Sequence, residues 1–284
     1  MQSRLSIKRL RRIGYKLSKT RLRVPLVWVR HRGLRASDVL LASHPRSGNT
    51  WLRFLLAEIL TGHKIDFDNI NNFIPELGRH RSAAAVLPAS GRLIKTHEQY
   101  RSEYRKAVYL VRDVRDVALS NYARGKELGV LSNISFDAFL PSFLDGTASR
   151  VGTWQEHVRS WLQSPLAHSD NLLVIRFEDL RRDAEVTIQK LLDFFPAEVN
   201  PAKMQEAILN NSIARMRSKE DSSRKLPSSS SEKGRFVRTG SVAGWQQQFT
   251  ERQVELVVHS AGAALSSLGY PITLPVPEAR AIGK

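Results

Sequence analysis

The 284-residue sequence contains no cysteine, which excludes disulfide bonds, thiolate metal sites and cysteine nucleophiles. Its eight histidines form no HxxxH or HxH cluster, so we expect no bound metal. No stretch approaches the roughly 18 consecutive apolar residues of a membrane span. The apolar run at residues 26–29 is too short for the core of a signal peptide. We therefore expect a cytoplasmic protein without a membrane-spanning segment.

Acidic residues are absent from the start of the chain. Residues 1–37 hold 12 of the 44 Lys and Arg residues and none of the 27 acidic ones, so the rest of the chain is only mildly basic. Leu10, Ile13 and Leu17 lie on one face of a possible helix, and such a basic amphipathic stretch can bind anionic lipid. A solvated extension has the same composition, whereas no aromatic–basic interleaving favours specific binding of nucleic acid.

The charge pattern divides the chain into a basic arm (1–36) and one domain (37–284). We expect residues 1–35 of the arm to allow peripheral contact with an anionic membrane or glycan. Pro25 is predicted to end any helix before the Val-Trp-Val run at 27–29.

The domain alternates strand-like and helix-like segments. Short apolar runs at 39–42, 92–97, 107–111 and 172–177 are typical of buried strands, and helical patterns follow three of them. Gly62 is a predicted helix stop, residues 63–92 are predicted to be loop with short helices, and residues 251–268 a last amphipathic helix. The helix after 107–111 is predicted to start at Val117, with Asp116 as its cap. The predicted fold class is therefore α/β, a mostly parallel sheet with helices on both faces.

The turn after the first strand-like run has the chemistry of an anion site. It reads Ser-His-Pro-Arg-Ser-Gly-Asn-Thr over residues 43–50, and a helix is predicted to begin there. Backbone N–H groups and the helix end favour an anion, Gly48 permits unusual backbone angles, and Arg46 adds charge. Asn49 or Thr50 is predicted to cap the helix. The turn is not a Walker A loop, and alone it is more often a simple connection.

Read with its neighbours, the turn resembles a known motif. SHPRSGNTW resembles the phosphosulfate-binding loop of the sulfotransferases, Y/H-P-K/R-S-G-[TN]-T-W. Four further segments are similar to that family in order and spacing, together covering about Val39 to Tyr270. They are the K-T-H motif at 95–97, the 3′-phosphate element at 107–122, the G-x-W-x-x-H-V-x-x-W helix at 152–161, and the F-x-R-K-G segment at 236–250.

The resemblance implies a P-loop-like fold and 3′-phosphoadenosine-5′-phosphosulfate (PAPS) as sulfuryl donor, with 3′,5′-bisphosphoadenosine (PAP) as product. It also implies that His97 is the catalytic base, and that Lys95 and Arg46 stabilise developing charge. Arg112, Ser120 and Arg238 would hold the 3′-phosphate. The residues that it assigns to the donor site are Arg46, Ser47, Gly48, Asn49, Thr50, Trp51, Arg112, Ser120, Phe177, Ile213, Arg238, Thr239 and Gly240.

The sequence departs from the family pattern at several positions. Val114 replaces a Pro, Phe177 a Tyr, Ile213 a Phe and Thr239 a Lys, and Asn211 stands in place of a Thr. The losses of an aromatic ring and of a charge predict weaker contacts with adenine and the 3′-phosphate. The Ser-rich stretch 221–235 is predicted to be a mobile lid loop.

Structural interpretations of the same residues stay open. A lone His at a strand end is usually structural, and an RDxRD string usually forms surface ion pairs. His157 is predicted to be a hydrogen-bonded structural residue rather than a ligand. The dimer motif of the soluble sulfotransferases is not visible in residues 251–256.

The reaction predicted from the resemblance is sulfuryl transfer from PAPS to a hydroxyl or amine acceptor, with no metal. The acceptor could be a glycan, a lipid, or a small alcohol or phenol. Two alternative classes are a P-loop-type phosphotransferase, for which no Walker lysine is present, and a non-catalytic module that binds polyanions or membranes.

Overall fold

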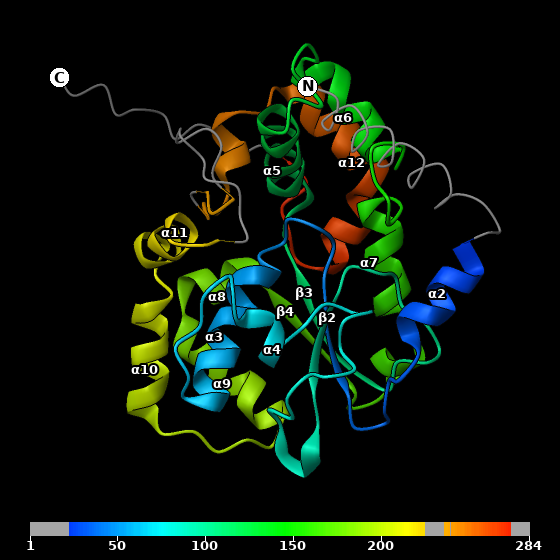
Figure 1. Ribbon diagram of the computed structural model, residues 1–284. Helices are drawn as coiled ribbons and strands as arrows, with labels where there is room; N and C mark the ends of the chain where they lie inside the picture. The colour runs from blue at the N-terminus through cyan, green and yellow to red at the C-terminus, as the bar shows by residue number, and fades with distance from the viewer. Residues whose placement is uncertain (1–22, 225–235, 239, 274–284) are drawn as a thin grey trace, which may run out of the picture.

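The computed structural model describes residues 23–224, 236–238 and 240–273, with side chains from Val27 onward. Within this part of the chain, four parallel strands form a sheet in the order β2-β1-β3-β4 (Figure 1). Their bounds are β1 Val39–Ala42, β2 Leu93–Thr96, β3 Lys106–Val111 and β4 Leu172–Arg176. Strands β1, β2 and β4 lie within runs that the sequence predicted as strand, and β3 begins one residue before its predicted run. The predicted α/β fold class is confirmed.

Strand side chains alternate between two hydrophobic cores because successive residues of a strand point to opposite faces. In β1, Leu40 and Ala42 contribute to one core and Val39 and Leu41 to the other. The register Val39↔Leu93 and Val39↔Lys106 aligns β1 with its two neighbours, so β1, β2 and β3 end at one edge of the sheet. The site described below is built at that edge.

Helices cover both faces of the sheet (Figure 1). One core includes residues of α5, α6, α7 and α12, and the other includes residues of α3, α8, α9, α10 and α11. Their bounds are α3 Asn49–Thr61, α5 Val114–Glu127, α6 Phe136–Leu144, α7 Trp154–Leu162, α8 Phe177–Arg182, α9 Ala184–Phe194, α10 Pro201–Asn210, α11 Ile213–Asp221 and α12 Glu251–Ser267. Gly62, at φ 68°, ends α3 as predicted.

The loops of residues 63–92 contain only the short helix α4 (Ile70–Phe73) and a 3₁₀ turn at Pro88–Ser90, as expected. Further 3₁₀ turns lie at Pro165–His168 and Gly244–Gln247. No helix in the described ranges is both long and apolar enough to cross a bilayer.

Three predictions about helix ends were wrong. Helix α2 (Arg23–His31) runs through Pro25, because a proline in the first turn removes no hydrogen bond that the helix needs. Helix α5 begins at Val114, since the Asp113 carboxylate caps it by accepting from Arg115 N, rather than after Asp116. Helix α3 has Gly48 at its N-cap position with no side-chain cap.

Helix α2 belongs to the predicted arm, yet it is packed on the domain. Val27 and His31 are buried, and the His31 Nε2 atom lies 2.8 Å from the Tyr104 hydroxyl. Arg30 forms an ion pair with Glu98 at 2.8 Å. The boundary at residues 36/37 stays a prediction. The contacts of Val27, Arg30 and His31 attach this part of the predicted arm to the domain.

Candidate active site

The site lies where the strand order reverses. Strand β1 has β2 on one side and β3 on the other, so the chain leaves β1 toward one neighbour and later returns on the opposite side. In open parallel sheets, ligands bind in the crevice at the carboxyl ends of strands at such a point. The β1–α3 turn and the residues that follow β2 and β3 meet there.

The β1–α3 turn is shaped by two left-handed residues. Gly48 has φ 94° and Arg46 has φ 72°, both in the region that glycine adopts most easily. A Cβ atom at position 48 would lie 2.4 Å from the Phe177 ring, so only glycine fits beneath that ring. The turn therefore brings its backbone N–H groups to the start of α3, where an anion is favoured.

Asn49 stabilises the turn from inside. Its amide donates to the Leu41 carbonyl at 2.9 Å and to Ser43 Oγ at 3.1 Å. This side chain was predicted to cap α3, and it instead ties the helix start back to the end of β1. The side chain of Ser47 is buried beside it, and its hydroxyl has no hydrogen-bond partner among the described residues.

His97 directly follows β2 and lines the pocket at the sheet edge. Its Nδ1 atom lies 2.8 Å from the Ser43 carbonyl oxygen, which can only accept, so Nδ1 carries the proton. The Nε2 atom of the neutral ring then keeps its lone pair. Burial, followed by the charge of Lys95, lowers the pKa of His97 to about 3, so the ring is neutral at pH 7.

His157, on α7, holds the backbone of His97. Its Nε2–H donates to the His97 carbonyl at 3.2 Å, and its Nδ1 accepts from the Tyr109 hydroxyl at 2.9 Å. The ring is fully buried and stacks on Tyr109. The prediction that His157 is a hydrogen-bonded structural residue is confirmed.

Lys95 also lines the pocket, and an acid that the sequence did not single out holds it. Its Nζ atom lies 2.7 Å from Glu76 Oε1. Leu77 N donates to the Lys95 carbonyl, so residues 75–77 run beside β2 and bring Glu76 to Lys95. Although partial burial raises it, the Lys95 ammonium lowers the pKa of Glu76 to about 2, so the carboxylate is ionised at neutral pH. Burial, and then the charge of Arg53, lower the pKa of Lys95.

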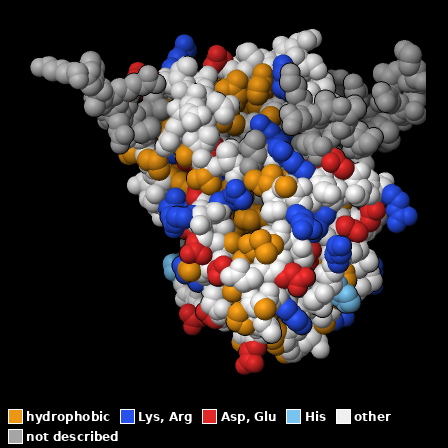
Figure 2. Space-filling view, turned by 90° about the vertical axis from the view of Figure 1, so that its left-hand side faces the viewer, with side chains coloured by type: hydrophobic (Ala, Val, Ile, Leu, Met, Phe, Trp, Pro, Cys, Tyr) orange, Lys and Arg blue, Asp and Glu red, His pale blue; other side chains and the backbone are white. Residues whose placement is uncertain are grey.

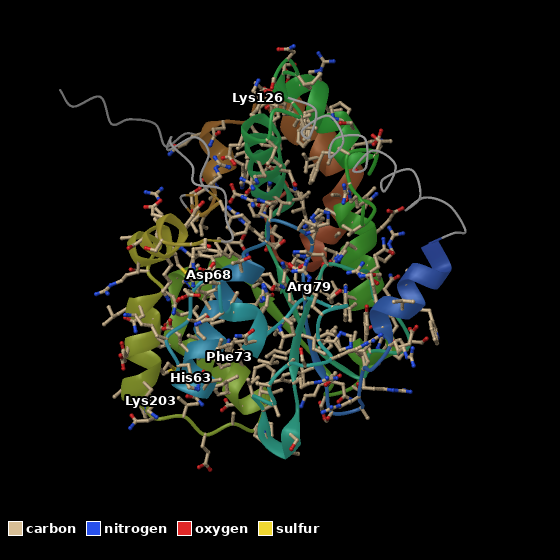
Figure 3. All side chains as sticks on the ribbon, viewed as in Figure 1. His63, Asp68, Phe73, Arg79, Lys126 and Lys203 are labelled. Atoms are coloured by element: carbon tan, nitrogen blue, oxygen red, sulfur yellow. The ribbon has the colours of Figure 1, made fainter. Side chains whose placement is uncertain are left out.

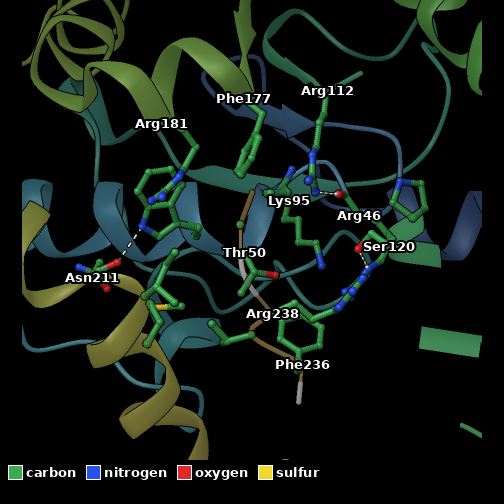
Figure 4. A pocket seen from close by; sticks show the side chains of 18 of the residues that line it. Arg46, Thr50, Lys95, Arg112, Ser120, Phe177, Arg181, Asn211, Phe236 and Arg238 are labelled. Carbon is green, nitrogen blue, oxygen red and sulfur yellow. Dashed lines mark hydrogen bonds between the residues drawn. The ribbon is translucent and has the colours of Figure 1, made fainter. Parts of the chain in front are cut away.

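The guanidinium groups of Arg46 and Arg112 also line the pocket (Figure 4). Arg46 Nε donates to Ser120 Oγ at 3.0 Å, and Arg112 donates to the Arg46 carbonyl at 3.2 Å and to the Ser241 carbonyl at 2.8 Å. Burial, and then the charges of Arg124 and Arg238, lower the pKa of Arg46 to about 10. Like charges held this close favour an anion between them.

The RDxRD string divides into two roles. Arg112 lines the pocket, while Arg115 is buried, pairs with Asp113 at 2.6 Å and lies over the Trp245 ring at 3.5 Å. The ion-pair interpretation therefore holds for Arg115. Arg112 approaches Asp116 only at 3.7 Å, and its buried Nε atom has no hydrogen-bond partner among the described residues.

Aromatic rings and a further cation form the remaining wall. The Trp51 indole donates to the Asn211 carbonyl at 2.8 Å and lies edge-on to Phe177, with ring centroids 6.1 Å apart. The Arg181 guanidinium lies 5.3 Å from the Trp51 ring centroid (Figure 4). Ile213 and Met216 of α11 also line this part.

Residues 236–238 and 240 also line the pocket. The buried Glu220 carboxylate of α11 accepts from the backbone N–H groups of Phe236 and Val237, the latter at 2.9 Å. The Phe236 ring lies 5.4 Å from the Arg46 guanidinium.

Thr239 and most of the predicted lid, residues 225–235, lie outside the described residues. Asp68 binds Ser223 Oγ at 2.9 Å just before that stretch (Figure 3).

One pocket thus brings together most of the predicted site. All the described residues that the sequence assigned to the site line this pocket, except Ser47, which is buried. Sequence analysis missed Glu76 and Arg181. Glu76 shows no local pattern, while Arg181 lies one turn after Phe177, and its helical spacing could have placed it on the same side.

The cations and hydrogen-bond donors of this pocket fit a nucleotide with two anionic groups. Cations, a glycine under an aromatic ring, helix-end N–H groups and two buried unpartnered donors line or adjoin one pocket. Phosphate and sulfonate oxygens accept from such groups, and Trp51 and Phe177 offer apolar faces for a base. No cluster of three or more potential metal ligands occurs in the part of the chain that the structure describes.

Comparisons with known proteins agree with this site. The chain is 28% identical to sulfotransferase 2A1 of Mus musculus over 236 residues, which span 78% of this chain and 82% of that protein. It is 24% identical to flavonol 3-sulfotransferase of Flaveria bidentis over 253 residues, 78% of this chain and 79% of the relative.

Two solved structures share the fold. Mouse sulfotransferase SULT7A1 complexed with PAP superposes with a TM-score of 0.65 at 23% identity, covering 86% of this chain and 92% of that chain. Retinol dehydratase in complex with androsterone and PAP gives a TM-score of 0.64 at 22% identity, covering 84% and 83%. The family described as the sulfotransferase domain matches residues 36–267. The chain therefore belongs to the sulfotransferase domain family and is a PAPS-dependent sulfotransferase.

Proposed function

We propose that His97 is the general base that removes a proton from the acceptor hydroxyl or amine. One observation carries this assignment: the Ser43 carbonyl accepts a hydrogen bond from His97 Nδ1–H, so Nε2 keeps the lone pair that a base needs. Burial and Lys95 keep the pKa of the imidazole low enough for it to be neutral at physiological pH. His157, itself held by Tyr109, positions the His97 ring by hydrogen bonding to the backbone carbonyl of His97.

Lys95 and Arg46 stabilise negative charge in the transferred group. When bound, PAPS supplies the sulfuryl group for the reaction. Lys95 is already oriented by Glu76, and Arg46 by Ser120, so neither side chain needs to reorganise much to meet the developing charge. A guanidinium does not give up its proton near neutral pH, so Lys95 is the candidate proton donor to the leaving oxygen.

The remaining residues hold the donor. Backbone N–H groups of Ser47–Thr50 bind the 5′-phosphate, and Arg112, Ser120 and Arg238 bind the 3′-phosphate together with the segment that contains Thr239 and Gly240. Trp51, Phe177 and Ile213 contact adenine. Thr239 lies outside the described residues, and all the others except Ser47 line the pocket.

The acceptor carries a hydroxyl or amine on a glycan, a lipid, or a small alcohol or phenol. The relatives named above include proteins whose names or ligands point to flavonols and to androsterone, which supports small hydrophobic alcohols and phenols first. A product screen by mass spectrometry with PAPS and pooled acceptors of these classes would identify it.

Replacing His97 tests the base. His97→Ala should lower turnover by a factor of about 10² or more, because general-base catalysis is lost. PAP should still raise the melting temperature of the variant without Mg²⁺, and more than ATP does, because the donor site is intact. If the variant keeps a tenth or more of wild-type turnover across neutral pH, His97 is not the base.

A further inference from the structure

Helix α2 exposes two large apolar side chains next to each other. Trp28 is 64% exposed and Val29 53%, although both residues lie in a regular helix of the described structure. The Arg32 guanidinium lies 5.8 Å from the Trp28 ring centroid, so a cation flanks the indole. An exposed indole beside an aliphatic side chain leaves apolar surface in water that a partner could cover.

The opposite side of α2 is fixed to the domain. Val27 and His31 are buried, one helical turn apart, and the His31 ring stacks on Tyr104 at 5.7 Å. The Arg30–Glu98 ion pair adds a second attachment. Trp28 therefore projects from an anchored helix, and Figure 1 places α2 at the outer edge of the molecule, on the right of the view.

The charge of the N-terminal sequence indicates which partner would cover α2. The 37 residues that contain this helix hold 12 cationic and no acidic side chains. On the face shown in Figure 2, by contrast, Lys and Arg side chains are interspersed with Asp and Glu. Tryptophan favours the boundary between lipid headgroups and acyl chains, and dense basic charge favours anionic headgroups.

We propose that α2 is a docking surface for an anionic lipid bilayer, with Trp28 and Val29 at the headgroup level. Interfacial helices of this kind combine an apolar contact with basic attraction, and each part alone is weak. The docking does not depend on the proposed catalytic roles.

Docking would also bear on the acceptor, a consequence that rests on the proposed function. Glu98, which Arg30 holds, directly follows His97, so α2 is attached next to the strand end that carries the base. An enzyme held at a bilayer through this helix would meet hydroxylated amphiphiles that partition into the membrane. This favours a lipid acceptor over a water-soluble glycan.

The full-length protein can test the docking with vesicles of phosphatidylcholine, with and without phosphatidylglycerol. It should sediment with the anionic vesicles at about 50 mM salt and be released as salt rises. Lipids brominated on the acyl chain should quench tryptophan fluorescence. Trp154, Trp161 and Trp245 are at most 2% exposed and Trp51 is half-buried within the nucleotide pocket, so quenching reports mainly on Trp28.

Two variants separate apolar docking from charge alone. Trp28→Ser with Val29→Ser should weaken vesicle binding about tenfold or more and remove the quenching. Leu209→Ser is the matched control, because Leu209 is 68% exposed on α10, on the other side of the molecule, and its loss should change nothing. Thermal protection by PAP in every variant shows that fold and donor site are intact.

Three outcomes would overturn the proposal. The protein could ignore anionic vesicles at about 50 mM salt. It could bind them equally well without Trp28 and Val29, or without quenching, which would make the contact purely electrostatic. It could bind a sulfated glycan in preference to the vesicles, which would assign the basic residues to a glycan. Loss of turnover by His97→Ala affects none of these readouts, so the two proposals fail separately.

Discussion

A histidine that is to accept a proton in a cationic pocket needs a fixed tautomer and must be neutral. Both needs are met for His97 by its immediate neighbours: the Ser43 carbonyl fixes the Nδ1 proton, and Lys95 disfavours the imidazolium. Lys95 is itself neutralised in part by Glu76 at 2.7 Å. The proposed base and the proposed catalytic cation thus influence each other's charge before any ligand is bound.

At the same scale, Arg112 is expected to recognise the 3′-phosphate. Arg112→Ala should weaken PAP binding by about 1.5–3 kcal/mol, the worth of a hydrogen bond to a charged group. Binding of adenosine 5′-phosphosulfate, which lacks that phosphate, should barely change. Titration calorimetry with both nucleotides measures the difference.

Arg112 also supports the β1–α3 turn by donating to the Arg46 carbonyl, so a control is needed. Arg112→Lys keeps the charge without the forked geometry and should lie between wild type and the alanine variant. Equal losses for the two nucleotides would mean that Arg112 acts on the turn rather than on the phosphate.

At the scale of elements, α11 connects the two ends of the donor pocket. Ile213 and Met216 line its apolar wall, and Glu220, two turns after Ile213, holds the backbone of Phe236 and Val237. Arg238 follows directly. The carboxylate therefore positions the predicted 3′-phosphate residue relative to the predicted adenine wall.

Glu220→Gln tests this connection. An amide nitrogen would face one of the two N–H groups, so one hydrogen bond is lost and a buried donor is left unpaired. PAP affinity should fall about tenfold, or about 1.4 kcal/mol, whereas adenosine 5′-phosphosulfate affinity falls less. The exposed Glu206→Gln on α10 is the matched control. An unchanged ratio of the two affinities would contradict a positioning role.

The sequence predicted helices and strands well where the pattern of neighbouring residues determines them. The runs Val39–Ala42 and Lys106–Val111 are short, apolar and β-branched, and they form β1 and β3 almost as predicted. The start of α5 was missed because the Asp113 cap stands three residues before the expected Asp116. Glu76 was missed because only the pairing of residues 75–77 with β2 brings it to Lys95. Motif spacing located the pocket, while the groups that orient it come from tertiary contacts.

At the scale of the whole molecule, buried histidines make folding sensitive to acid. Burial lowers the pKa of His44 to about 4, of His97 to about 3, and of His157 well below its ordinary value. The unfolded chain binds these protons near pH 6.5 and the folded chain does not. Stability is therefore fully present above about pH 6.5 and falls as the pH drops toward the folded values.

Asp116 opposes this trend, because burial raises the pKa of its carboxyl to about 6, and folding takes up one proton there. With three histidines against one carboxyl, the free energy of unfolding should fall by about 2–4 kcal/mol between pH 7 and pH 5. Urea unfolding across that range measures it. His97→Asn should flatten the curve, whereas His63→Asn, at an exposed position shown in Figure 3, should not. A flat wild-type curve would contradict the burial of these rings.

The beginning of the chain should divide into a part that the fold needs and a part that it does not. Arg92 is buried, pairs with Asp38 at 2.6 Å, and donates to the Gly33 carbonyl at 2.8 Å; Arg35 N also donates to Asp38. Deleting residues 1–36 removes Gly33, Arg35 and all of α2. It should cost about 2–4 kcal/mol of unfolding free energy, as expected when buried hydrogen bonds and packing are lost together.

Deleting only residues 1–22 removes eight of the basic side chains and none of these contacts, so stability and PAP binding should stay at wild-type levels. The same truncation should reduce sedimentation with anionic vesicles, because each basic residue near such a surface contributes about 1 kcal/mol. Urea unfolding of both truncations beside the full chain provides the comparison. Equal stability of the two truncated proteins would show that α2 is not part of the cooperative fold, and the anchored position assigned to Trp28 would be lost with it.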